Sequence, residues 1–450
     1  MSKMAMEGRI RKPHRRDWPG YLNRILPASL WQALSMEMAP ATDGRVRWTP
    51  KYVILCWVMM GWSMQRQLTH RFHESWHVLG RLYSRRRRAG SSYQGLVKAT
   101  LRLGQEILHR FAGCLRESIP KRVGSRWYWY GWVVMAVDGS RIKAPRTRAN
   151  QRKLRRAGRD KSHPQWWITC LIHLPSRIIW DWRQGPGNSS ERAHMRKMIP
   201  GLPANTLLLG DIGFGGFRML RDLNKAGVSF LVRCCSNTTL LVNETRQRIE
   251  RRGGCQYVYL WPRDCRRQPP LQLRLIVLKS GGRRVYLLTN VMDSTKLSRP
   301  MAGELYKARW GIEINYRSLK QTMERCKLQA KDTKAGAMEL SGNILALMLL
   351  MLQAFLAMGA RAVRASVATV LRIIRDLMAS IRYCRPTVPL CACLCEAVMD
   401  EYVRYSSKKT HDWPYKKRDP VPSPPQLRRP TRAERICINR VWGWTSPGFS

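Results

Sequence analysis

Hydrophobic positions follow two different patterns along this chain. Up to about residue 125 the apolar side chains recur at helical spacing, for example in Val53–Met64 and Leu101–Leu115, and basic, glycine-containing turns such as Arg85–Gly90 separate these stretches. From Trp127 onward, short runs rich in aromatic and β-branched residues have the length of strands. The chain therefore predicts a helical region followed by a mixed α/β sheet. The expected strands are Trp127–Val137, Trp166–Leu174, Ile178–Trp182, Thr206–Gly210 and Val228–Arg233.

Helical segments are expected between and after these strands. One begins at Ser189-Ser190-Glu191 and another covers Phe217–Ala226. Helix returns at Met301 and continues, with breaks, to about Met378. Within it, the apolar run Ile344–Gly359 favours a buried core helix over a membrane span, because sixteen residues are short for a bilayer.

Residues 238–292 predict an inserted β-rich subdomain, and the last 45 residues predict a loosely ordered, basic tail. The strands of the insertion are expected at Tyr257–Trp261, Leu271–Leu278 and Arg284–Asn290, with turns at Pro269-Pro270 and Gly281-Gly282. The expected regions are 1–125 (helical, basic and DNA-binding), 126–237 (first part of the core), 238–292 (insertion), 293–380 (helical second part of the core) and 381–450 (basic C-terminal region and tail).

Charge narrows the possible partners. The 450 residues include 81 Lys and Arg against 29 Asp and Glu, which gives a formal net charge of +52, while 44% of the residues are hydrophobic. A disordered polycation, a secreted disulfide scaffold, a membrane channel and an enzyme of small neutral molecules are therefore unlikely classes, and nucleic acid is the expected partner. In residues 1–125, 23 basic and 7 acidic side chains suggest a DNA-gripping helical module, although a solvated helical cap has the same composition.

Cysteine usage and the N-terminus bear on the compartment. The 13 cysteines are scattered and form no C-x2-C pair, so they are interpreted as structural residues in a reducing cytoplasm. Met1–Arg16 is basic and lacks an apolar core, which predicts no secretory signal. The sequence thus favours a cytoplasmic, DNA-associated protein without a membrane segment. The Gly213–Gly216 stretch is not followed by Lys-Ser/Thr, so no nucleotide cofactor is expected.

Acidic residues are scarce, and two of them follow apolar strands. Asp138 comes after Val133–Val137, and Asp211 comes after Leu207–Gly210. Ligand groups of α/β sheets commonly lie where strands end, although a single aspartate there is more often a turn or cap residue.

A third carboxylate lies on a predicted helix, Gly303–Leu328. At about 100° per residue, five polar side chains of this helix fall on one face. A carboxylate surrounded by phenol, guanidinium and ammonium groups suits metal binding next to phosphate contacts. The five are Tyr306, Arg309, Glu313, Arg317 and Lys320.

These residues resemble a known family. The spacing Tyr306-x2-Arg309-x3-Glu313-x6-Lys320 matches the Y-(2)-R-(3)-E-(6)-K signature of the IS4-type insertion-sequence transposases. The segment Val137-Asp138-Gly139-Ser140 resembles the one around their first catalytic aspartate, and Leu209–Phe217 resembles the one around the second. Thr289-Asn290 also resembles the family, and the likeness covers roughly residues 90–420.

The resemblance implies an RNase H-like (retroviral integrase-like) core with a catalytic and metal-binding triad of Asp138, Asp211 and Glu313. It implies two Mg²⁺ ions, for which Mn²⁺ can substitute, and hard carboxylate ligands agree with that choice. It also implies cut-and-paste transposition on double-stranded DNA, with terminal inverted repeats and target DNA as substrates and a homodimer in the synaptic complex.

DNA contacts are expected beyond the triad. By resemblance, Tyr306, Arg309 and Lys320 contact phosphates near the scissile bond, and an aromatic residue of the insertion stacks a flipped base. The candidate for that residue is Trp261, for which burial in the core is equally plausible. Arg317 is added from its place on the helix face.

A basic stretch supplies two further candidates, Arg141 and Lys143. Nine Lys or Arg and no acidic residue lie between Arg141 and Arg159, which predicts a loop that follows the DNA backbone or, alternatively, a solvated charge run.

Three other functions stay open at the level of sequence. A non-catalytic packaging or RNA-binding protein would explain the charge but not the face that carries Glu313. A nuclease of the same fold would hydrolyse DNA without joining it, and an inactive copy of an insertion element would carry the same motifs.

Overall fold

The computed structural model describes residues 18–36, 47–83, 89–158, 162–280, 283–383, 390–398 and 422–443. The chain divides into two compact units. We call residues 1–126, 142–166 and 316–399 the helical unit, and residues 127–141, 167–315 and 400–450 the sheet unit. The predicted turns at Arg85–Arg88 and Gly281-Gly282, and the N-terminal segment Met1–Arg16, lie outside the described residues.

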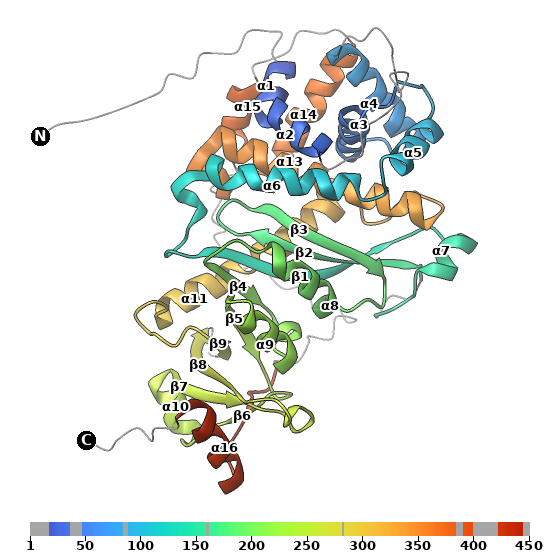
Figure 1. The fold of residues 1–450 in the computed structure, drawn as a ribbon. Coiled ribbons are helices and arrows are strands. Elements are labelled where there is room, and N and C mark those ends of the chain that lie inside the picture. Colours follow the sequence, from blue (N-terminus) through green and yellow to red (C-terminus); the bar gives the residue numbers. More distant parts are fainter. Residues whose placement is uncertain are drawn as a thin grey trace, which may run out of the picture. The chain divides into compact units, whose positions relative to one another are not determined.

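The helical unit consists of helices from the N-terminal region and from the segment after Met323 (Figure 1). Besides its α-helices, this unit contains the 3₁₀ turn Gly359–Arg364 and a π-helical turn, Ser318–Thr322. Its α-helices are α1 (Trp18–Ile25), α2 (Ala28–Met36), α3 (Pro50–Trp62), α4 (Leu68–Leu82), α5 (Tyr93–Arg102), α6 (Ile107–Val123), α7 (Arg148–Lys153), α13 (Thr333–Met358), α14 (Val367–Arg382) and α15 (Leu390–Glu396).

Two helices, α3 and α13, form the centre of this unit. Both are apolar around most of their circumference, and nearly every side chain of each is buried, as expected for helices surrounded by others. They approach closely because glycines lie at the contact: a Cβ on Gly61 would come 2.5 Å from the Cβ of Ala346. The Trp62 indole N–H then donates to the Ala346 carbonyl at 2.9 Å.

Helix α13 also bears on the expectation of no membrane span. Among the described residues it is the one helix that is long and apolar enough to cross a bilayer, and 89% of its most apolar window is buried inside the protein. Core helices of soluble proteins pass the same test of length and composition. Residues 344–355 of α13 are all buried, which confirms the core helix predicted at Ile344–Gly359.

A buried ion pair fastens α13 to α4. The guanidinium of Arg71 lies 3.0 Å from a carboxylate oxygen of Glu339, and both side chains are 2% exposed. The remaining lone pairs of Glu339 accept the backbone N–H groups of Gln329 and Ala330, each at 2.9 Å. Arg325, equally buried, donates to the Ser63 carbonyl at 2.6 Å, and burial lowers its pKa to about 9.

Most strands of the sheet belong to the sheet unit, and among the described residues the sheet has ten strands in the order β10-β6-β7-β8-β9-β5-β4-β1-β2-β3. Strands β1, β4 and β5 are parallel, whereas β5 to β9 and β6 to β8 pair antiparallel, so the sheet is mixed as predicted. The strands are β1 (Val133–Lys143), β2 (Gln165–His173), β3 (Ile178–Pro186), β4 (Thr206–Gly210), β5 (Ser229–Cys234), β6 (Thr239–Leu241), β7 (Gly254–Leu260), β8 (Leu271–Ser280), β9 (Arg283–Thr289) and β10 (Gln426–Arg428).

Helices of the sheet unit lie beside these strands (Figure 1). Helix α8 packs on β3 and α9 packs on β5, while α10 and α11 contact β7 and β8. The segment predicted as a β-rich insertion forms β6 to β9, which continue the same sheet beyond β5. The helices are α8 (Glu191–Met198), α9 (Phe217–Lys225), α10 (Arg246–Arg252), α11 (Arg299–Ala308), α12 (Gly311–Arg317, which reaches into the helical unit) and α16 (Arg432–Trp442).

The first predicted strand is displaced. Trp127 belongs to a 3₁₀ turn, and Tyr130 and Gly131 have positive φ angles of 53° and 79°. These angles close a tight turn in which Trp129 and Trp132 exchange backbone hydrogen bonds, so β1 begins only at Val133. It also runs beyond Asp138 to Lys143, and Asp138 is therefore not at a strand end.

The prediction of a loosely ordered tail is wrong for residues 426–442. Strand β10 pairs in parallel with β6, and α16 begins with a capping box between Thr431 and Glu434. Glu434 also accepts hydrogen bonds from Arg428 and Arg266, at 2.6 and 2.5 Å. These local signals were hidden in the sequence by the surrounding proline and basic residues.

The described cysteines are free thiols, and half of them are buried. Burial raises the pKa of the Cys56 and Cys234 thiols far above the ordinary value, so both stay protonated. This agrees with the interpretation of the cysteines as structural residues.

Candidate active site

Asp138 and Asp211 belong to segments that pair as neighbouring parallel strands. The pairing of β1 with β4 ends at Ala136 opposite Leu209. Asp138 lies two residues further along β1, and Asp211 lies two residues beyond Leu209, directly after the end of β4. The register of the pair therefore brings the two aspartates to the same end of these strands.

The surroundings of Asp211 come from α11. The Tyr306 hydroxyl donates to Oδ1 of Asp211 at 3.4 Å, and an Nη atom of Arg309 lies 4.0 Å from Oδ2. The Asp211 side chain is 41% exposed, whereas the Arg309 side chain is 4% exposed. Burial, and then the negative charge of Asp211, raise the pKa of Tyr306 well above its ordinary value, so the phenol keeps its proton and remains a donor.

Arg309 connects the aspartate to the third predicted acid. The same Nη atom is 3.8 Å from a carboxylate oxygen of Glu313, whose side chain is 42% exposed. The buried Nε of Arg309 has no hydrogen-bond partner in the described part of the chain. Its guanidinium also lies over the Tyr306 and Trp310 rings, with its carbon 5.5 and 5.4 Å from their centroids. Two long ion pairs and an unsatisfied N–H leave this cation able to bind another anion.

The continuous helix predicted for Gly303–Leu328 is wrong. Helix α11 ends at Ala308, α12 starts at Gly311, and a π-helical turn follows at Ser318–Thr322. At the break, the backbone N–H groups of Arg309 and Trp310 bond three residues back instead of four, to Tyr306 and Lys307. Beyond this tightened turn, Tyr306 and Arg309 lie beside Asp211, and Glu313 lies beside Arg309.

The other two residues of the predicted face fall outside the sheet unit. Arg317 ends α12 and Lys320 lies in the π-helical turn, and both belong to the helical unit. Their contact with DNA stays a prediction.

An acidic residue that sequence reasoning did not place near the two aspartates is Glu191. It is the first residue of α8, after the cap Ser190, which confirms the predicted helix start. A Cβ on Gly139 would come 2.9 Å from its Oε2, and a Cβ on Gly213 would collide with its Oε1. Burial raises the pKa of Glu191, and the charges of Asp138 and Asp211 add to the shift. The available signal was a rare acid next to a turn, interpreted only as a helix start.

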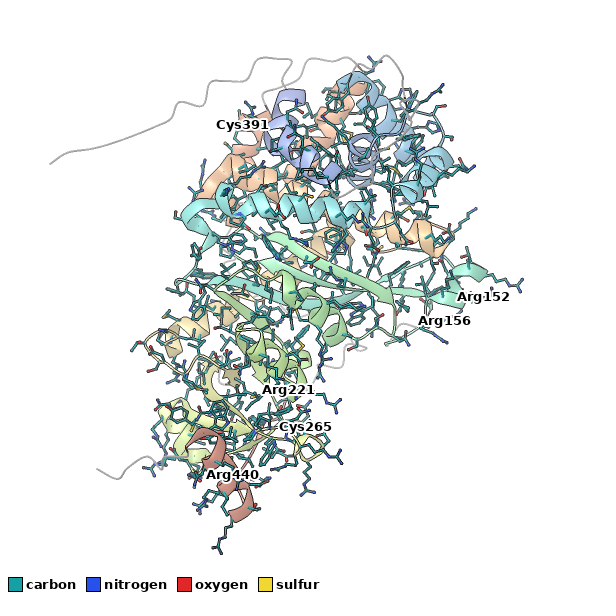
Figure 2. The ribbon with its side chains drawn as sticks, viewed as in Figure 1. Arg152, Arg156, Arg221, Cys265, Cys391 and Arg440 are labelled. Carbon is teal, nitrogen blue, oxygen red and sulfur yellow. The ribbon has the colours of Figure 1, made fainter. Side chains whose placement is uncertain are left out.

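The basic stretch after Asp138 has exposed side chains. The Arg141 guanidinium stacks on Trp167, 4.2 Å from its ring centroid, and donates to the Gly187 carbonyl at 3.2 Å. Lys143 ends β1 and belongs to the helical unit, where its backbone pairs with Cys326 and Leu328. Within that unit, Arg152 and Arg156 extend outward from and beyond α7 (Figure 2).

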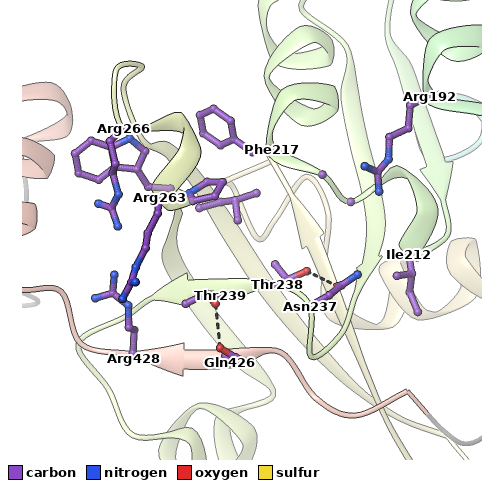
Figure 3. A pocket seen from close by; sticks show the side chains of 15 residues that line it. Arg192, Ile212, Phe217, Asn237, Thr238, Thr239, Arg263, Arg266, Gln426 and Arg428 are labelled. Atoms are coloured by element: carbon purple, nitrogen blue, oxygen red, sulfur yellow. Dashed lines mark hydrogen bonds between the residues drawn. The ribbon is translucent and has the colours of Figure 1, made fainter. Parts of the chain in front are cut away.

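A pocket of about 550 Å³ lies within the sheet unit, beside the loop that follows Asp211 (Figure 3). Four arginines line it, together with the polar edges of β6 and β10: Arg192, Arg263, Arg266 and Arg428. Trp261 is part of the wall but is 9% exposed. Its indole N–H donates to the Gln268 carbonyl at 2.6 Å, and Arg266 covers its ring at 4.2 Å.

The donor set of the three predicted acids fits a hard divalent cation. Asp138, Asp211 and Glu313 offer carboxylate oxygens, and the last two are exposed enough to receive an ion. As the described residues stand, no three Asp, Glu, His or Cys side chains are close enough to hold one together. A shared site therefore needs rotation of these half-exposed side chains.

Comparison with known proteins bears on this arrangement. Residues 129–349 match the family model described as "Transposase DDE domain". These residues are therefore similar to the DDE domain of transposases. Over 272 residues the chain is 25% identical to the transposase InsG for insertion sequence element IS4 of Escherichia coli (strain K12). The match covers 54% of this chain and 56% of that protein, so the chain spans little more than half the length of its curated relative.

The matched segment contains all three predicted triad residues and Tyr306, Arg309 and Glu191. A structural comparison also aligns 86% of the chain with 84% of the piggyBac transposase in its synaptic complex with hairpin DNA, at 12% identity and a TM-score of 0.41.

Proposed function

We propose that this protein is a DNA transposase that cuts the ends of an insertion sequence and joins them to target DNA. The observation that supports this most directly is the arrangement around Arg309, which lies within 4.0 Å of Asp211 and Glu313 inside the DDE domain. The register of β1 and β4 adds Asp138 to the same edge. The protein is further proposed to have an RNase H-like core, to work in the bacterial cytoplasm on double-stranded DNA, and to act as a homodimer.

The proposed reaction has two steps of the same kind. Water attacks a phosphodiester at the transposon end, the bond from phosphorus to O3′ breaks, and a 3′-hydroxyl and a 5′-phosphate result. That hydroxyl then attacks a phosphodiester of the target and displaces a new 3′-hydroxyl, so the number of phosphodiester bonds is conserved. Asp138, Asp211 and Glu313 would hold two Mg²⁺ ions, or Mn²⁺, which supply Lewis acidity at the scissile phosphate.

The neighbouring residues have roles that follow from their contacts. The unsatisfied guanidinium of Arg309 binds and orients a phosphate beside the triad, since its present ion pairs are long. Tyr306 donates a hydrogen bond from a phenol that stays neutral. Lys320, Arg317, Lys143 and Arg141 are proposed to contact the DNA backbone.

The arginine-lined pocket is proposed to receive a nucleotide that leaves the duplex. Its volume and four guanidinium groups suit a nucleotide with its phosphates. Stacking of the base on Trp261 requires Arg266 to move off the ring, because that side chain now covers it.

The test is a cleavage assay with DNA that carries the ends of the element. Glu313→Gln should reduce nicking by about a thousandfold or more while the protein still binds the ends, because only a charge needed in the reaction is removed. Glu304→Gln, a substitution on the neighbouring helix α11, is the matched control and should cleave normally. Cleavage that survives Glu313→Gln contradicts the triad.

Strand transfer needs its own measurement. Pre-cleaved ends with a free 3′-hydroxyl are incubated with a plasmid target, and joined products are counted. Wild-type protein that nicks ends but never joins them is a nuclease, and the transposase proposal is then wrong.

A further inference from the structure

Trp167, on β2, contacts two residues of the segment that follows Asp138. We propose that Trp167 is a positioning residue for DNA binding, whose indole ring holds the Arg141 guanidinium in place for a backbone phosphate. The proposal rests on the proposed function, because it assigns a supporting residue to one of the DNA contacts that this function requires.

The residues involved share one face of the sheet. Gly139 and Arg141 are two positions apart on β1, so their side positions point to the same face. Strand β2, which carries Trp167, is the neighbour of β1 in the sheet. A Cβ on Gly139 would collide with the Trp167 ring, and the Arg141 guanidinium stacks on that ring, 4.2 Å from its centroid. The glycine therefore leaves the space that the indole fills beside Arg141.

Hydrogen bonds on the same face hold the indole in one orientation. Its N–H donates to the hydroxyl of Thr169, a fully buried residue two positions further along β2, at 3.1 Å. That hydroxyl lies 3.0 Å from Nδ1 of His194 and can donate to it, because burial lowers the pKa of His194 and keeps the ring neutral. The indole of Trp167 is therefore a fixed support for the side chain stacked on it.

The guanidinium of Arg141 is held by two contacts that leave its outer nitrogens available. Its Nε donates to the Gly187 carbonyl at 3.2 Å, and its flat face lies on the Trp167 ring. Within the part of the chain that the structure describes, its two Nη groups donate no hydrogen bond; the charge of Glu191 acts nearby, but the two side chains form no ion pair. Two Nη groups can bind two oxygens of one phosphate, and a side chain fixed beforehand loses less entropy on binding.

A second arginine–tryptophan stack in the sheet unit has the opposite arrangement. Arg266 lies over the Trp261 ring at the same distance, 4.2 Å, but one of its Nη groups donates to the Glu434 carboxylate at 2.5 Å. The protein itself therefore neutralises Arg266. No carboxylate of the described residues bonds Arg141, so this stacked cation is left for an anion from outside the protein.

The experiment is a double-mutant cycle on DNA binding by the full chain. The affinity for a labelled duplex that carries the element's end is measured at several salt concentrations for wild type, Arg141→Gln, Trp167→Leu and the double variant. Arg141→Gln should lower the slope of log affinity against log salt by about 0.9, the value for one lost phosphate contact. Trp167→Leu should weaken binding about threefold to fivefold, as loss of a cation–π stack does, and should have no effect in the Arg141→Gln background.

A purely structural role of Trp167 predicts a different result. Lost packing between β1 and β2 would weaken binding whether or not Arg141 is present, so equal losses in both backgrounds overturn the proposal. Unchanged affinity in Trp167→Leu also overturns it. Trp167→Phe keeps a ring beneath the guanidinium and should bind within about twofold of wild type. If phenylalanine is no better than leucine, the ring is not the support and the proposal is wrong.

Trp442→Leu is the matched control for loss of an indole. Trp442 is 40% exposed, and its N–H donates to the Pro270 carbonyl at 2.9 Å. The substitution removes a ring and one hydrogen bond, as Trp167→Leu does, but no arginine contact that the proposal uses. This variant should bind the duplex like wild type.

A variant at Arg141 tests the same contact without altering the ring or the packing of β2. Arg141→Lys keeps the positive charge, and with it the salt slope, but lysine has no flat guanidinium to stack on the indole and no Nε to bond Gly187. It should weaken binding about as much as Trp167→Leu. Wild-type affinity in Arg141→Lys would show that the placement of the charge does not matter, and the proposal is then wrong.

The outcomes also separate this inference from the function on which it rests. Wild-type protein that cleaves element ends, with Arg141→Gln binding them at wild-type affinity and salt slope, overturns the role of Trp167 and leaves the transposase function unaffected. Wild-type protein that neither binds nor cleaves these ends overturns both.

Discussion

Two buried arginines, one in each unit, have similar exposure and opposite surroundings. Arg71 is 2% exposed, bonds Glu339 at 3.0 Å and donates its Nε to the Gln65 carbonyl at 2.7 Å. Arg309 is 4% exposed, stands 3.8 and 4.0 Å from two carboxylates, and has an Nε without a partner among the described residues. The carboxylate partner of Arg71 is also 2% exposed, whereas those of Arg309 are about two-fifths exposed.

The difference separates a structural ion pair from a binding site. Around Arg71 and Glu339 each group is satisfied by the protein, so nothing is left for a ligand to supply. Around Arg309 the protein buries a guanidinium without completing its hydrogen bonds, which is unfavourable, and the carboxylates face solvent. Substitution should therefore affect folding in the first region and chemistry in the second.

The largest effect is expected at Glu339. Glu339→Gln leaves the charge of Arg71 buried without its counter-ion, next to the equally buried Arg325, and should lower the free energy of unfolding by about 3–5 kcal/mol. Denaturant unfolding monitored by tryptophan fluorescence measures this. Adding Arg71→Met should recover part of the loss, and an unchanged midpoint in Glu339→Gln would contradict the comparison.

A smaller effect, on chemistry instead of folding, is expected at Arg309. Arg309→Gln removes the cation between Asp211 and Glu313 and should slow single-turnover cleavage about a hundredfold, which corresponds to about 2.7 kcal/mol. The unfolding midpoint should change little, because both ion pairs of Arg309 are long and weak. Arg372→Gln is the control: this exposed arginine pairs only at 3.7 Å with Asp376, and its loss should leave cleavage within about twofold. Strong destabilisation by Arg309→Gln would make this arginine structural, like Arg71.

The smallest effect concerns the C-terminal segment and depends on pH. The hydrogen bonds from Arg428, and those from Thr431 and Arg266, lower the pKa of Glu434 from 4.5 to about 2. Because the pKa is lower in the folded protein, Glu434 contributes stability above pH 4.5, and that contribution is lost as the pH falls from 4.5 through 2. The hydrogen-exchange protection factors of α16, which are corrected for the intrinsic pH dependence of exchange, should fall in this range. Glu434→Gln should remove this change in protection and cost about 1 kcal/mol, as loss of a cap does, and equal protection factors at about pH 5 and about pH 2 in wild type would contradict this.

Much of the sheet and part of the site could be predicted from the sequence. Thr206–Gly210 was predicted with its observed bounds, because five buried apolar residues between turn signals leave little choice. The spacing of Tyr306, Arg309 and Glu313 predicted one shared helix face, and Arg309 lies beside Glu313 in the structure. The break at Arg309 and Trp310 could not be predicted, since a switch to shorter-range hydrogen bonds leaves helical periodicity almost unchanged.

Other features depend on contacts between distant segments. The nearness of Glu191 to Asp138 and Asp211 follows from the order of β1, β4 and α8 in space, and no local pattern encodes that order. The pairing of β10 with β6 joins segments almost 190 residues apart in the chain, and the short strand has no signal of its own. Domain boundaries and the roles of Lys143, Arg317, Lys320 and Trp261 stay predictions.

The place of β10 in the sheet has a consequence for the order in which the protein is made. Gln426 and Arg428 line the arginine-rich pocket, yet they leave the ribosome after more than nine-tenths of the chain has been synthesised. Until then β6 is an open edge strand and the pocket lacks one wall. A message that stops before codon 426 would therefore yield a chain with its catalytic carboxylates present and this pocket incomplete.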